Sequence, residues 1–197
     1  MNRWFWLFCC LLGFFPREAP AEEGVIPGNQ VLVSTEEMYR RWAKHRPEEV
    51  IAQGRKAVRY IQNNGESVFS EFNEPSKEEW WSDRPYFTPV MVMRCDEMRN
   101  VTHPVAQFYK ILTQKGTVSK FVDARGEHTF LELCQKLLRK SEPVWVKQYH
   151  YWPGTKEPVW MAVLGMPVPG TFYQIHLFYL TPEPDLERLN QLLLTNP

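Results

Sequence analysis

Apolar and polar positions recur at helical spacing in the first part of the folded chain. Ser34 or Thr35, followed by two glutamates, is a typical helix start, because a polar cap and early carboxylates complement the free backbone N–H groups. Pro47 suits the first turn of a second helix, and Gly65 is expected to end it. A shorter helical piece is predicted over 66–72. The pattern predicts a broken helical hairpin whose apolar face needs a covering partner.

Downstream, the pattern changes to partial two-residue alternation, which is typical of strands. Strands are predicted, in chain order, over 86–93, 145–152, 159–165 and 171–180, with a short strand leading to position 103. An irregular middle stretch precedes a helix predicted over 129–138, and 185–194 form a small amphipathic helix. Helices followed by an antiparallel meander indicate an α+β fold with about five strands.

These elements are expected to form a single domain over 34–182, followed by the C-terminal amphipathic helix at 183–197. The N-terminal helices should cover one face of the sheet, and the middle loop should cross the other face. A long loop over a sheet is a common way to form a small-ligand pocket.

The first 21 residues have the pattern of an export signal. A short positive start precedes an apolar run of twelve residues, 4–15, which Pro16 ends. Ala19-Pro20-Ala21 has the small-x-small form of a cleavage site, and 22–33 are expected to be a flexible leader. A membrane-spanning helix needs about 20 residues, so the alternative to cleavage is an interfacial anchor. We expect a periplasmic or secreted protein, cleaved near Ala21.

The cysteine content indicates whether a disulfide can form, and the net charge indicates whether nucleic acid is a partner. Cleavage leaves Cys95 and Cys134, which an oxidising compartment could join in a disulfide; two buried free thiols are the alternative. The 23 basic residues balance 23 acidic ones, so the chain has no net field to hold a polyanion. Nucleic acid is therefore not an expected partner.

Signals of catalysis are weak. The five histidines include no pair at the helical spacing of metal ligands, and no glycine-rich phosphate loop is present. His150 and His176 could meet across strands, but two ligands do not make a metal site. A cysteine with a histidine could form a nucleophilic pair, although no recognisable oxyanion loop accompanies it. We expect no enzyme activity, no metal and no cofactor.

Residues 50–179 resemble the bacterial single Cache domain, a PAS-like extracytoplasmic sensor module. The matching segments, in family order, are YIQNNG at 60–65 with FSEFN at 69–73, Tyr86 with VMVM at 90–93, His103-Pro104, DARG at 123–126 with Phe130, and WV at 145–146 with YHYWP at 149–153. Their order and spacing carry the resemblance, since no single motif is specific. It implies a fold whose relatives bind small organic acids or amines, often as the outer part of chemoreceptors and kinases.

One residue and two segments depart from the family pattern. Val159 stands where the family commonly has a lysine after the Trp-Pro turn. The segment 141–144 replaces a glycine-rich lead, and 96–100 replaces an Asp-Gly turn. If the missing lysine pairs with a carboxylate in relatives, acid binding is weakened here.

One face of the strand predicted over 145–152 has the composition of a pocket wall. Alternation places four side chains on this face, namely Trp145, Lys147, Tyr149 and Tyr151. The other face then carries Gln148, His150 and Trp152. Aromatic walls and an amine would suit a small polar ligand. The alternative is that the aromatic rings are core and that Lys147 is a solvent residue at the sheet edge.

Other residues are candidates for the same pocket. His103 could donate a hydrogen bond to a bound carboxylate, or it could be a structural turn histidine. Asp123 could hold a ligand amine, although ordering the Asp-x-x-Gly turn is the favoured role. Tyr86 and Trp160 are weaker candidates that are more typical of a core.

We therefore expect an extracytoplasmic sensor domain that encloses a small organic acid or amine, with His103 and Lys147 satisfying a polar head group. Such a domain would report to a partner, for example a membrane sensor kinase or chemoreceptor. The alternative is a degenerate Cache domain that acts as an envelope protein-interaction module without a metabolite ligand.

Overall fold

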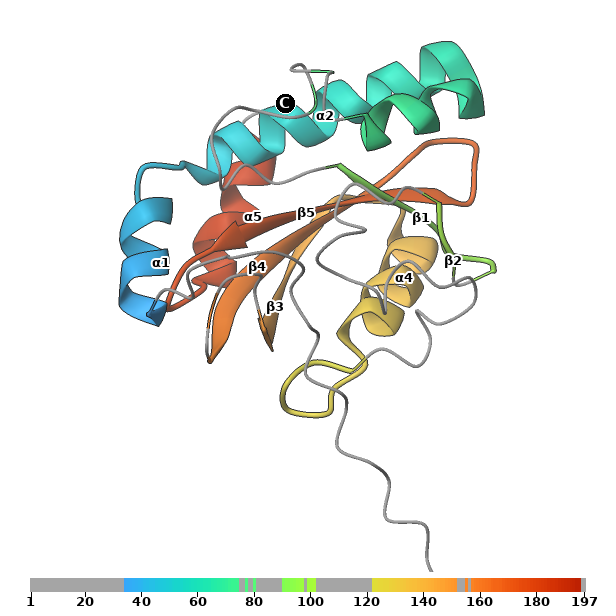
Figure 1. Cartoon of the computed structure of the whole chain (residues 1–197). Coiled ribbons are helices and arrows are strands. Elements are labelled where there is room, and N and C mark those ends of the chain that lie inside the picture. Colours follow the sequence, from blue (N-terminus) through green and yellow to red (C-terminus); the bar gives the residue numbers. More distant parts are fainter. Residues whose placement is uncertain are drawn as a thin grey trace, which may run out of the picture.

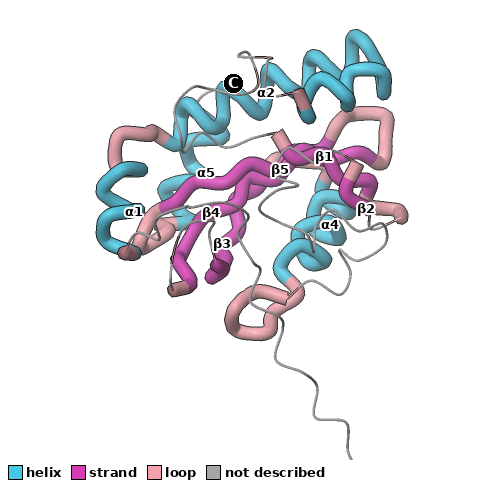
Figure 2. The backbone as a smooth tube through the Cα atoms, viewed as in Figure 1, coloured by secondary structure: helices cyan, strands magenta, loops and turns pink. Residues whose placement is uncertain are grey.

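The computed structural model describes residues 34–74, 77, 80, 90–97, 99–101, 122–151, 155 and 157–195 (Figures 1 and 2). The predicted signal peptide and leader, the start of the first predicted strand and most of the middle loop lie outside these residues. Within the described part, no helix is both long and apolar enough to span a membrane.

Both N-terminal helices begin where the sequence predicts, and the second also ends there. Helix α1 (Thr35–Trp42) is capped by Ser34, whose side chain accepts a backbone N–H three residues ahead at 3.2 Å. Helix α2 (Pro47–Asn64) ends at Gly65, which has a φ of 68° that glycine tolerates better than other residues. The next piece, η1 (Gly65–Asn73), is a 3-10 helix.

Five antiparallel strands form the sheet of the described chain, in the order β2-β1-β5-β4-β3. They are β1 (Met91–Arg94), β2 (Arg99–Asn100), β3 (Val144–Tyr151), β4 (Pro158–Pro167) and β5 (Tyr173–Leu180). Since β2 has only two residues, the other strands carry the sheet. Strand β5 starts later than predicted because the Thr171 hydroxyl donates back to the Val168 carbonyl within the preceding turn.

Helices cover both faces of the sheet (Figures 1 and 2). Helices α2 and α5 (Leu186–Thr195) pack on one face, called here the α2 face. Helix α4 (Thr129–Lys140) packs on the other, the α4 face. The predicted α+β fold with N-terminal helices packed on an antiparallel sheet is confirmed. Helix α1, however, contributes Met38 and Trp42 to the core of the α4 face.

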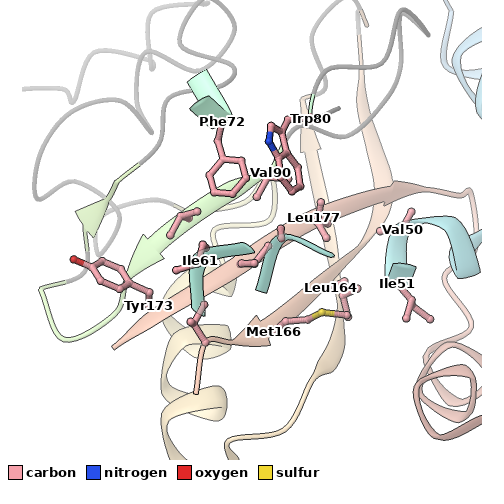
Figure 3. Packing of buried hydrophobic residues seen from close by; sticks show 14 of the residues in the cluster. Val50, Ile51, Ile61, Phe72, Trp80, Val90, Leu164, Met166, Tyr173 and Leu177 are labelled. Carbon is pink, nitrogen blue, oxygen red and sulfur yellow. The ribbon is translucent and has the colours of Figure 1, made fainter. Parts of the chain in front are cut away.

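The core of the α2 face is nearly all apolar. Figure 3 shows Ile51 and Ile61 lying over the sheet beside Met166 and Leu177. Helix and sheet approach closely at Gly54, where a Cβ atom would lie 2.8 Å from both Leu177 Cδ1 and Met166 Sδ. Burial of this face anchors the long helix to the sheet.

The free edge of β3 is also covered. The Trp145 N–H donates to the side chain of Asn190 in α5 at 3.1 Å. Further along, the Tyr149 N–H donates to Asp123 at 3.3 Å, and the Tyr149 carbonyl accepts the Ala124 N–H at 2.7 Å. Because an open edge exposes unpaired backbone groups, α5 and the loop before α4 protect this side of the sheet.

Candidate functional site

The α4 face buries polar side chains among its apolar ones. Val146 of β3 packs against the core of this face, so alternation places Gln148 and His150 on the same face. Strand β5 adds Gln174 and His176, which lie beside α4. Gln148, Gln174 and His176 are each at most 1% exposed. Buried polar groups normally have hydrogen-bond partners, so the partners of these residues decide what the face can do.

Gln148 is one of the buried residues whose side-chain polar atoms lack hydrogen-bond partners among the described residues. Its side chain is 0% exposed, and neither Oε1 nor Nε2 has a hydrogen-bond partner among the described residues. Its cross-strand neighbour is the apolar Met161. A buried polar group left unpaired costs about 1–3 kcal/mol. The amide therefore calls for a donor and an acceptor that the described residues do not supply.

His150 lies two residues further along β3, directly opposite Val159 of β4. Burial lowers the pKa of its imidazole to about 4, and the Asp123 carboxylate opposes this shift. The ring is therefore neutral at pH 7, with one nitrogen as donor and the other as acceptor. Val159, where the resemblance to Cache domains predicts a lysine, is 0% exposed.

Asp123 organises the turn that leads into α4. Its Oδ1 accepts the N–H groups of Arg125 and Glu127 at 2.8 and 3.1 Å, and its Oδ2 accepts the Tyr149 N–H at 3.3 Å. Burial acts to raise the pKa of this carboxyl, but the three backbone donors and the Arg125 charge outweigh it and hold the pKa below its usual range. Both oxygens are used by the chain itself.

The face of β3 predicted as a pocket wall is on the α2 side of the sheet. Lys147 Nζ lies 4.0 Å from the centroid of the Trp160 ring, and the Arg125 guanidinium lies 4.8 Å from the same centroid. The Tyr149 ring is 4.7 Å from this indole. The fold thus brings Asp123, Lys147 and Tyr149 together, but at the edge strand, where Lys147 is exposed.

Trp145 does not join this group. It is 1% exposed and packs edge-on against Tyr179, with ring centroids 6.3 Å apart, in the core beneath α5. The backbone of Tyr151 ends β3, and its side chain is outside the described set. Tyr86 and His103 lie outside the described residues.

Sequence patterns do not reveal the role of Tyr39. Its hydroxyl accepts the Trp160 N–H at 2.6 Å and donates to the Trp160 carbonyl at 3.1 Å. The β4–β5 ladder begins one residue further on, with Met161 opposite Leu180. Tyr39 therefore satisfies the backbone of β4 where β5 has ended, a contact across 121 residues that helical spacing cannot show.

A disulfide joins Cys95, in the turn after β1, to Cys134 of α4, with their Cα atoms 5.5 Å apart. His176 lies next to this disulfide. It does not meet His150, because His176 is opposite Gly165 whereas His150 is opposite Val159.

Comparison with known proteins supports the fold alone. No protein-family model matches the sequence, and no curated protein is significantly similar to it. One similar solved structure concerns carboxylic acid recognition by a Cache chemosensory domain; it is 14% identical, covers 74% of this chain and 97% of its own, and has a TM-score of 0.50. Another is the periplasmic sensor domain of a chemotaxis protein, 14% identical, with coverage of 73% and 97% and a TM-score of 0.48. The first of these two likenesses shows that the chain has the PAS-like fold of Cache sensor domains.

Proposed function

We propose that this protein is an extracytoplasmic sensor domain that binds a small organic acid or amine without reacting with it. The observation that carries the proposal is the Gln148 amide, which is fully buried and has no partner for either polar atom among the described residues. A buried amide of this kind is costly in an empty site and becomes favourable when a ligand supplies its hydrogen bonds. We place the ligand on the α4 face of the sheet.

The amide suits either class of ligand. Gln148 Nε2 donates two hydrogen bonds, as a carboxylate requires, and Oε1 accepts, as an amine requires. Its cross-strand neighbour Met161 is apolar and 0% exposed, so it would exclude water and strengthen the polar contacts. Neutral His150, two residues along the strand, would add a second donor or acceptor.

This placement differs from the sequence-based expectation, in which Lys147 and the tyrosines of β3 form the pocket wall. Lys147 is exposed and lies over the Trp160 ring. Because this group lies on the opposite face from the proposed ligand, we assign the edge group around Trp160 to a partner surface. His103 stays a proposed ligand contact.

The test is a thermal-shift screen of the purified protein against small carboxylates, amino acids and amines. A ligand at one hundred times its Kd adds about 2.7 kcal/mol of stability. With a ligand identified, Gln148→Leu should abolish the shift while leaving the unliganded protein as stable or more stable, because the substitution removes an unpaired amide. Lys147→Met is the matched control, being the next residue on the opposite face, and should keep the shift.

A second candidate function is an envelope interaction module without a metabolite ligand. The observation that favours it is Val159, an apolar and fully buried residue at the position of the family lysine. A flat screen, together with loss of stability in Gln148→Leu, would favour this function. The edge group around Trp160 would then be the first surface to test for a protein partner.

A further inference from the structure

A second polar cluster on the α4 face contains three residues that can ligate metals. Cys95, Cys134 and His176 are all buried, and their two Sγ atoms and one imidazole nitrogen lie within 4.8 Å of one another. They come from the turn after β1, from α4 and from β5. No sequence motif links them, since the two cysteines alone are 39 residues apart.

Hydrogen bonds set the proton position on His176. Gln174 Nε2 donates to the Cys134 carbonyl at 3.2 Å, which turns Gln174 Oε1 toward the histidine. This oxygen lies 3.3 Å from His176 Nε2. Because an amide oxygen only accepts, His176 Nε2 must carry the hydrogen, and Nδ1 keeps its lone pair. Nδ1 is buried and has no hydrogen-bond partner among the described residues.

This arrangement is that of a metal-binding histidine with its supporting partner. Metal-ligating histidines commonly donate their other N–H to an oxygen, which fixes the tautomer and the ring orientation. The Phe130 ring of α4 also packs against the imidazole. The two ring centroids are 5.8 Å apart, and the ring planes are nearly parallel, at an angle of 4°. The ring therefore has a fixed plane, a fixed tautomer and an unused lone pair, and one of its nitrogens lies near two sulfur atoms.

We propose that Cys95, Cys134 and His176 form a zinc site when their disulfide is reduced. A dithiol reductant transfers two electrons and two protons, breaking the S–S bond to give two thiols, while the reductant itself becomes a disulfide. Zn²⁺ then replaces both thiol protons and binds two thiolates and His176 Nδ1. Three protein ligands leave the fourth tetrahedral position for a small donor.

Charge and geometry select this ion. Two thiolates neutralise a divalent cation, whereas Cu⁺ with the same ligands would leave a net negative charge in a buried site, which is costly. Ligand atoms of a tetrahedral zinc site lie about 3.5–3.8 Å apart, so the largest present separation, up to 4.8 Å, has to shorten by about 1 Å. The two sulfur atoms, which are bonded to each other in the disulfide, have to move apart to the same spacing once the bond is broken. Cys95 lies in a turn, where the backbone can make this adjustment.

The experiment uses the full chain with Cys9→Ser and Cys10→Ser, so that only the proposed thiols remain. The protein is reduced with a phosphine, freed of reductant without air, and titrated with Co²⁺ as a spectroscopic substitute for Zn²⁺. We expect one equivalent to produce thiolate-to-cobalt charge-transfer bands and the strong d–d bands of a tetrahedral site. Zn²⁺ should abolish these bands by displacing Co²⁺, and Zn²⁺ added to the metal-free reduced protein should release two protons. The oxidised protein should show neither the bands nor the proton release.

Variants separate the site from other metal binding. His176→Phe keeps a ring against Phe130 and should weaken Zn²⁺ binding more than about a hundredfold, measured by competition with a chromophoric chelator. Gln174→Leu should weaken it about 10–100-fold while keeping the charge-transfer bands. The control His128→Asn changes an exposed histidine and should have no effect. The proposal is overturned if the reduced protein unfolds, lacks thiolate-to-cobalt bands, binds Cu⁺ but not Zn²⁺, or binds Zn²⁺ equally well after Gln174→Leu.

Discussion

The two faces of the sheet are built from the same strands but differ in the polar side chains that they bury. The α2 face has an almost wholly apolar core, in which Gln53 is the buried polar side chain contributed by α2. The α4 face mixes apolar residues with Gln148, Gln174 and His176, all buried. The α2 face therefore gains stability by excluding water, whereas the α4 face carries polar groups whose value depends on what they bind.

Because the α2 face stabilises the fold by apolar packing, we expect a binding site to be tolerated better on the α4 face. The indole N–H groups of Trp80 and Trp145 on the α2 face also lack hydrogen-bond partners among the described residues, so what distinguishes the α4 face is that it buries whole polar side chains. Unsatisfied buried polar atoms in a native structure are expected at sites of function. The predictions below test whether the two faces respond to substitution in these different ways.

The largest expected effect is on the α2 face, at Trp145. Replacing this buried residue with Ala removes a large ring and should cost about 3–5 kcal/mol of unfolding free energy, measured by denaturant titration. Where Trp145→Ala stays folded, it should keep the ligand response. Loss of the response with unchanged stability would instead place Trp145 in the pocket, as the sequence pattern allows.

The α4 face should be sensitive to acid through His150. The folded pKa of about 4 lies below the ordinary value of 6.5, so the unfolded state binds the proton first as pH falls. The stability due to the neutral ring is present above pH 6.5 and is lost between pH 6.5 and 4, by up to about 3 kcal/mol. Between pH 4 and 6.5, the slope of unfolding free energy against pH corresponds to the protons taken up on unfolding. His150→Gln should reduce this number by about one. An unchanged slope would show that the ring is hydrated.

Sequence patterns predict most of the fold because a helix or strand buried on one side must show its period. The starts of α1 and α2, the helix at α4 and the strands β3 to β5 follow from caps, breakers and alternation. Alternation also places the side chains of Gln148 and Lys147 on opposite faces of the sheet, as the structure does. It cannot tell which face receives which helix, and this is why the sequence pattern places the pocket on the α2 side of β3, whereas we propose the α4 side.

The remaining features depend on contacts between residues far apart in the sequence. Tyr39 bonds to the backbone of Trp160 across 121 residues. The proximity of His176 to Cys134 follows from the way α4 crosses β5, and no motif encodes that crossing. The missing partners of Gln148 are a property of the whole fold, so no local pattern contains them.

On each face of the sheet, a glycine lies where a helix packs closely against a strand, so the two glycines allow the faces to be compared. A Cβ atom at Gly165 would lie 2.6 Å from Leu137 Cδ1 and 2.8 Å from Leu133 Cδ1 of α4. Gly165→Ala should therefore cost about 1–3 kcal/mol by overpacking. Gly54→Ala on the α2 face meets flexible side-chain ends and gains about 1 kcal/mol of helix propensity, so its net cost should be smaller. Thermal unfolding of both variants tests the order, and the reverse order would contradict it.

The smallest expected effect is at the end of the sheet. Tyr39→Phe removes the hydroxyl that serves the Trp160 backbone and should cost about 1 kcal/mol. Amide hydrogen exchange should show faster exchange at Trp160, with no change at Ile175 in the middle of β5. Uniform acceleration along β5 would mean that α1 supports the whole sheet rather than its end.

The most direct test of the account is to record the side-chain amide signals of ¹⁵N-labelled protein with and without the ligand found by screening. The Gln148 NH₂ pair, assigned as the pair that is missing in Gln148→Leu, should shift strongly on binding, whereas the Gln53 pair on the α2 face should not move. A Gln148 pair that stays in place while the indole N–H of Trp160 shifts would contradict the account and put the ligand on the opposite face.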